Sequence, residues 1–154
     1  MHPLFEDYLD RIKVFHDDFA QTIAGLPQEA LDWTPGTEMN SLAMLIMHAT
    51  GSARYWVGDI CLEDESRRDR DAEFRVRGMD EMALRKRLDE TTRYMESALE
   101  RLSLDELAEI RSAPGRDQTY RIGYALLHAL EHTGLHLGQA QMTRQLWDQH
   151  EKQA

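Results

Sequence analysis

The chain has 154 residues, of which 42% are hydrophobic and 30% charged, and its formal net charge is -10 at pH 7. This acidic balance argues against general binding of nucleic acids, because an acidic surface repels phosphate backbones. The length suits a single domain over residues 1–154 that buries a core without disulfides. The one cysteine, Cys61, cannot form an internal disulfide and suits the reducing cytoplasm.

The N-terminal stretch MHPLFEDYLDRIK lacks the basic start and the continuous apolar run of a secretory signal. No segment approaches the roughly 18 consecutive apolar residues that a membrane-spanning helix needs. We therefore expect a cytoplasmic protein with no membrane partner and no nucleic-acid partner.

The first half of the chain predicts two helices. Apolar residues recur at helical spacing from about Leu4 to Ala24 and indicate an amphipathic helix. Residues 25–40 carry two prolines and two glycines and predict an irregular connection. A second helix is expected from a cap at Asn40 or Ser41 to about Leu62, and its apolar start predicts a central position.

The second half predicts two more helices. Residues 63–78 are dense in charge, including the RRDR run at 67–70, and predict a solvated loop with a short extended piece at Phe74 to Val76. A third helix is expected from about Met79 to Leu102, with Met82 on its apolar side. The RSAPGRDQ stretch breaks the chain before a fourth helix from about Thr119 to Trp147.

No strand alternation and no internal repeat is evident, so the fold class is an all-α four-helix bundle. Its connections are longer than those of a minimal up-down bundle, which favours a crossover topology.

The predicted fourth helix contains histidines at four-residue steps: His128, His132 and His136. Each step advances roughly 40° around a helix, so His132 and His136 share a face and lie close enough to chelate one ion. Leu135, Met142 and Leu146 are assigned to the same face, which would point the histidines into the bundle. Buried imidazoles need polar partners, and either a metal ion or hydrogen bonds within a packed core would supply them.

His48 strengthens the metal interpretation, because it interrupts the most apolar stretch of the second helix, LAMLIMHAT. It would add a third ligand from a facing helix, and three imidazoles leave coordination positions open, as catalytic metal sites do. The HExxH protease motif is excluded by Thr133. By contrast, His16 is predicted to lie on the surface because Asp17 and Asp18 follow it.

Two stretches, WTPGTEMNSLAMLIMHATGSARYW (33–56) and LLHALEHTGLHLGQAQMTRQLW (126–147), resemble the DinB superfamily of four-helix bundles. The resemblance implies a homodimer and a divalent metal held by His48, His132 and His136, with His128 as a neighbour of the site. Zinc or nickel is the expected metal, and iron or manganese is the alternative. Many members have arginine where this chain has Leu137.

The resemblance also implies a class of activity, because the superfamily includes S-transferases that use bacillithiol or mycothiol and a mycothiol-dependent isomerase. We expect a metal-dependent enzyme acting on a small molecule, by thiol S-transfer or by related hydrolysis or isomerisation. The alternatives are a non-enzymatic metal-binding bundle with a structural or sensing role, and a bundle without metal.

Several other residues are candidates for the pocket or for supporting the ligands. Besides His128 they are Tyr124, Arg54 and Tyr55, and packing or surface positions are the alternative for the last two. Gln139 is expected on the inner face, either supporting a ligand or packing. Gly138 is expected to let a neighbouring helix approach closely.

Overall fold

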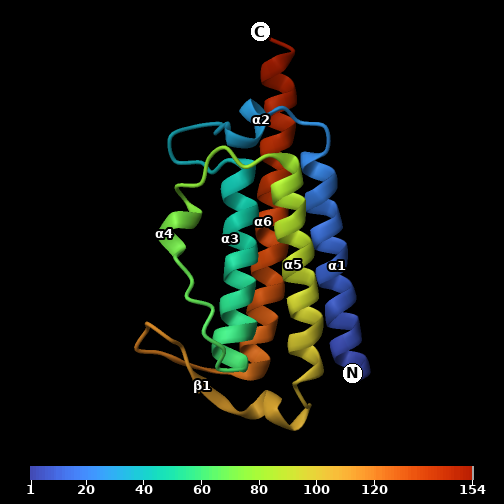
Figure 1. Cartoon of the computed structure of the whole chain (residues 1–154), viewed down its shortest axis with the longest axis vertical. Coiled ribbons are helices and arrows are strands. Elements are labelled where there is room, and N and C mark those ends of the chain that lie inside the picture. Colours follow the sequence, from blue (N-terminus) through green and yellow to red (C-terminus); the bar gives the residue numbers. More distant parts are fainter. Residues whose placement is uncertain (154) are drawn as a thin grey trace.

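Four long helices pack side by side along most of their length (Figure 1). They are α1 (Pro3–Ile23), α3 (Leu42–Arg54), α5 (Glu81–Glu100) and α6 (Ile122–Glu151). This computed structural model describes residues 1–153. The prediction of an all-α four-helix bundle is confirmed.

Short polar side chains cap the N-termini of two of these helices. The Ser41 hydroxyl accepts a hydrogen bond from the Met44 amide at 3.2 Å at the start of α3. The Asp80 carboxylate accepts one from the Ala83 amide at 2.8 Å at the start of α5. Such caps satisfy amides that have no partner within the helix. The second predicted helix does reach Cys61, but its last part, Tyr55–Cys61, is wound as a π-helix.

The helices are joined by a long crossover. In Figure 1, α1 and α6 run in one direction while α3 and α5 run in the other. Because α3 and α5 are parallel neighbours, the chain must travel back along the bundle between them. Residues 62–80, which include the short helix α4 (Arg70–Glu73), make this return, and we call them the crossover. The predicted crossover topology is confirmed.

The other connections contain short elements. A short helix, α2 (Gln28–Asp32), lies in the first connection, which was expected to be irregular. A 3-10 turn (Asp105–Ala108) follows α5 and agrees with the short turn of helix that the stretch SLDELAEI (103–110) predicts. Strands β1 (Ile110–Ser112) and β2 (Thr119–Arg121) pair antiparallel. The expectation of no strands was therefore wrong, since three-residue strands are too short to show alternation.

The expected extended piece at Phe74 to Val76 was also wrong. Phe74 ends α4 with helical backbone angles, φ -89° and ψ -1°. Met82 was misassigned too, because its side chain is exposed rather than on the apolar side of α5.

Two apolar clusters fill the interior. One gathers around Ile12, Trp56 and Met95, and the other gathers around Phe19 and Ile46. These clusters fix the spacing of α1, α3, α5 and α6, and so they place side chains of α3 opposite those of α6. None of the helices within residues 1–153 has the length and apolar character required to cross a bilayer.

Candidate metal centre

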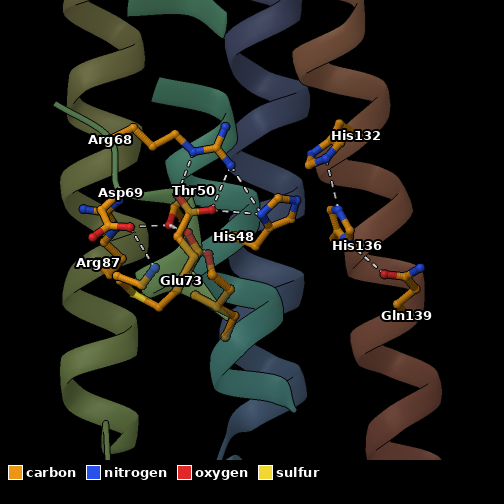
Figure 2. A network of polar contacts seen from close by, with 12 residues as sticks. His48, Thr50, Arg68, Asp69, Glu73, Arg87, His132, His136 and Gln139 are labelled. Atoms are coloured by element: carbon orange, nitrogen blue, oxygen red, sulfur yellow. Dashed lines mark hydrogen bonds and ion pairs between the residues drawn. The ribbon is translucent and has the colours of Figure 1, made fainter. Parts of the chain in front are cut away.

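Three histidines converge where α3 and α6 face each other (Figure 2). His48 comes from α3, and His132 and His136 come from consecutive turns of α6. One ring nitrogen from each lies within 4.8 Å of the other two. The structure thus brings together the three residues that the sequence nominated. In the chain, His48 precedes His132 by 84 positions and His136 by 88 positions.

Two of the rings are held through their outer nitrogens. His48 Nδ1 lies 2.9 Å from a carboxylate oxygen of Glu73, and His136 Nδ1 lies 2.7 Å from Oε1 of Gln139. Both oxygens favour the tautomer with the proton on Nδ1, and in that tautomer Nε2 has a lone pair for a metal. An Arg68 guanidinium nitrogen lies 3.3 Å from the same His48 Nδ1. Gln139 is exposed, so its predicted place on the inner face was wrong, although it does contact a nominated ligand.

The third ring has no such support. His132 Nε2 lies 3.1 Å from His136 Nε2, and His132 Nδ1 is buried without a hydrogen-bond partner among the described residues. Burial and the neighbouring histidines lower the pKa of His132 to about 3, and burial lowers that of His136. Both rings are therefore neutral at pH 7, which is the form that binds metals. Three imidazoles with converging nitrogens fit a divalent ion that prefers nitrogen ligands.

Glu73 reaches His48 from the crossover and is itself paired with Arg68. The guanidinium donates from Nε to one carboxylate oxygen at 2.7 Å and from a terminal nitrogen to the other at 2.8 Å. Both side chains are buried, at 9% and 7% exposure. Burial alone would raise the pKa of Glu73, but the hydrogen bonds from Arg68 and His48 lower it below its usual value. The carboxylate therefore stays ionised beside His48.

This pair was not predicted from the sequence, because the whole of residues 63–78 was expected to form a solvated loop. Charged residues without apolar periodicity give no sign that two of them turn inward. One signal was present: Gly51 follows His48 by one helical turn, and a Cβ at Gly51 would overlap the Glu73 carboxylate. A glycine inside a helix often marks such a close approach.

A row of aromatic rings extends from the cluster along α6. The His128 ring lies 5.6 Å from that of His132 and packs 4.2 Å from that of Trp56. The Tyr124 ring stacks nearly parallel to that of His128, and Tyr120 stacks on Tyr124 at 5.3 Å. His128 and Tyr124 thus lie beside the three converging nitrogens and outside that cluster. We call Trp56, Tyr120, Tyr124 and His128 the aromatic row.

Other sequence expectations for α6 were wrong. Leu135 and Met142 are each more than half exposed, so the histidines do not share a core face with them. The buried stripe of α6 lies to one side, and His132 and His136 stand half-buried at its edge. A Cβ at Gly138 would meet nothing within 4 Å, so no helix makes the expected close approach there.

Three residues considered for chemistry lie apart from the cluster. The Arg54 guanidinium stacks over the Tyr94 ring at 3.8 Å, towards α5. Tyr55 is buried, and its hydroxyl donates to the Pro114 carbonyl at 2.8 Å. Cys61 is buried as well, and burial raises the pKa of its thiol to about 12, so it is no nucleophile at neutral pH.

Comparison with known proteins supports the fold. The model of the DinB superfamily matches residues 11–140. The crystal structure of a conserved protein from Enterococcus faecalis superposes with a TM-score of 0.74 at 16% sequence identity, covering 92% of this chain and 95% of that chain. Identity this low indicates a shared fold alone. No curated protein matches the chain.

Proposed function

The chain belongs to the DinB superfamily, and on that premise we propose that it is a metal-dependent enzyme acting on a small molecule. Its metal ligands would be His48, His132 and His136. The observation that carries this proposal is the convergence of three ring nitrogens within 4.8 Å. Glu73 and Gln139 add support, since each holds the outer nitrogen of one ring.

The donor set favours particular metals. Three imidazole ligands suit zinc or nickel, with iron or manganese as alternatives, better than magnesium or calcium, which prefer oxygen. Three protein ligands also leave a coordination position for a substrate or cofactor atom. A divalent ion held there supplies Lewis acidity, which lowers the pKa of a coordinated thiol or water.

The residues around the cluster orient a ligand, leave the cluster accessible and offer an apolar surface. Glu73 fixes the direction of the His48 ring from the buried side. His132 and His136 are only half-buried, so the cluster is accessible from the α6 side. The aromatic row begins beside His132 and offers ring faces to an apolar part of a substrate.

Thiol S-transfer is the reaction class that we favour. The only thiol of the chain, Cys61, is buried with its pKa raised to about 12, so the chain offers no nucleophilic thiol of its own. The reacting thiol would therefore come from a low-molecular-weight cofactor such as bacillithiol or mycothiol. Hydrolysis and isomerisation are the alternatives at the same centre.

Metal analysis of tag-free protein tests the first part of this proposal. We expect close to one divalent ion per chain in the parent protein and in His128→Ala, and a loss of most of it in His132→Ala and His136→Ala. Unchanged metal content in the last two variants would contradict the assigned ligands.

An activity assay tests the second part. Metal-loaded protein is supplied with a low-molecular-weight thiol and monochlorobimane, and thiol conjugation is followed by fluorescence. Metal binding without turnover of any thiol, together with a large loss of melting temperature on chelation, would instead favour the non-enzymatic bundle. The homodimer stays a prediction, and light scattering on the eluting protein would measure it.

A further inference from the structure

A polar pocket lies on the side of Glu73 that faces away from the three histidines. It has a volume of about 500 Å³ and is bounded by α3, α5 and the crossover. Four arginines contribute to its lining: Arg54, Arg67, Arg68 and Arg87. This concentration of positive charge stands out in a chain whose net charge is -10.

The acidic residues of this pocket are already engaged. Both Glu73 oxygens accept from Arg68, and one of them also contacts His48. Asp69, the other acid in the lining, caps α4 by accepting from the Ala72 amide at 2.9 Å. Among the described residues, neither carboxylate forms an ion pair with Arg54, Arg67 or Arg87.

Arg87 and Arg54 each contact a neutral side chain directly. The Arg87 side chain is half-buried on α5 and donates from Nε to the Thr50 hydroxyl at 3.0 Å. Arg54 is held against the Tyr94 ring. Within residues 1–153, neither guanidinium forms an ion pair with a carboxylate. Burial, and then the nearby charge of Arg54, lower the pKa of Arg87, while the charges of Glu73 and Glu90 act in the opposite direction.

Two guanidiniums that share one concave, half-buried pocket create a local positive potential, which attracts an anion. The planar fork of a guanidinium matches the oxygens of a carboxylate or phosphate. Apolar groups of Met47 and Val76 also line the pocket and would cover a short carbon chain. From this arrangement we propose that the pocket binds the carboxylate or phosphate group of a small molecule, held chiefly by Arg54, Arg67 and Arg87.

This site is distinct from the candidate metal centre. In Figure 2, Arg87 lies towards α5, while His132 and His136 lie on α6, with Glu73 and His48 between them. An anion against Arg87 would therefore not touch the three nitrogens. The proposal does not depend on the proposed enzymatic function and holds for metal-free protein too.

Calorimetric titration tests the anion site with two probes, inorganic phosphate and succinate, at an ionic strength held constant with sodium chloride. We expect saturable binding of at least one probe, weakened about tenfold or more in Arg87→Gln and in Arg67→Gln. Arg67 is exposed, and its side chain forms no hydrogen bond or ion pair that the substitution would remove. Weaker binding in Arg67→Gln therefore reports a lost contact with the anion and not a loss of folding. Arg93→Gln is the matched control, because Arg93 is an exposed arginine of α5 outside this pocket, and it should bind like the parent.

Three results would overturn the proposal: no saturable binding of either probe, equal affinities in all four proteins, or heats that sodium chloride alone reproduces. Stronger binding of phosphate than succinate would assign the phosphate class, and the reverse would assign the carboxylate class. Repeating the titration after chelation should leave the affinity unchanged. Loss of anion binding on chelation would contradict a site separate from the metal.

Discussion

His48 Nδ1 and a carboxylate oxygen of Glu73 are 2.9 Å apart, although 25 positions separate the two residues in the chain. One belongs to a central helix and the other to the crossover. Their contact sets the direction of the His48 ring, so the geometry of the candidate metal centre depends on a segment that supplies no ligand itself.

Replacing Glu73 with glutamine should therefore weaken metal binding. Partners of this kind typically contribute about 10- to 100-fold to affinity, and we expect Glu73→Gln to lose about tenfold, because an amide is a weaker acceptor than a carboxylate. Competition with a chromophoric chelator measures the dissociation constant for zinc. Glu65→Gln removes an exposed carboxylate of the same crossover and should leave the constant unchanged. Equal constants in both variants would argue against the role given to Glu73.

The Arg68–Glu73 pair should matter for stability as well. Removing one partner of a buried pair leaves the other charge unmatched, and such changes cost about 3–5 kcal/mol. We expect a loss of that order in the free energy of unfolding of Arg68→Met, measured with urea. Arg75→Met, at an exposed position of the crossover, should change it little. A small loss in Arg68→Met would mean that the pair is more hydrated than its burial indicates.

Gly51→Ala should behave opposite to an ordinary helix substitution. Alanine stabilises a helix interior by about 0.5–1 kcal/mol over glycine, but a Cβ at Gly51 would displace the Glu73 carboxylate. We expect lower stability and weaker zinc binding together. Gly138→Ala is the control, since nothing lies within 4 Å of its added Cβ, and its melting temperature should be equal or higher. A Gly51→Ala protein as stable as Gly138→Ala would contradict the close approach.

His16 should make the protein sensitive to acid. Contrary to its predicted surface position it is buried, with Nδ1 2.6 Å from the Thr92 hydroxyl and Nε2 without a partner among the described residues. Burial lowers its pKa from 6.5 to about 4, partly opposed by Asp89. The unfolded chain therefore takes up the proton first as the pH falls, and stability is lost between pH 6.5 and 4.

The size of this effect follows from the pKa difference. It amounts to about 3 kcal/mol by pH 4, since each pKa unit corresponds to about 1.4 kcal/mol. His16→Gln should lack this part of the acid sensitivity. Urea unfolding of both proteins at pH 7 and pH 4.5 gives the comparison, and identical changes in their unfolding free energies would refute the assignment.

The sequence supported those features whose cause is local. Ser41 caps α3 through an amide three residues away, and His132 and His136 adjoin because of helical geometry. His16 was misassigned from its acidic neighbours, although it follows Ile12 by one helical turn and precedes Phe19 by another, on a buried stripe. Helix phase was the better guide there.

Contacts between segments that lie far apart in the chain could not be predicted from the sequence. Nothing near Arg68 or Glu73 in the chain indicates that they turn towards His48, because that contact exists only once the crossover lies against α3. The partnership of His48 with α6 was proposed from its position in an apolar stretch and assigned through the family resemblance, since the pattern alone left a packed histidine as an alternative. The arginine pocket likewise draws on α3, α5 and the crossover, so no single stretch displays it.

The crossover has an evolutionary consequence. Connecting segments usually accept insertions and deletions more readily than helices do. Here a length change between Arg68 and Glu73 would shift one partner of a buried ion pair and release the His48 ring. We therefore expect natural relatives with a similar centre to keep the five-residue spacing from Arg68 to Glu73.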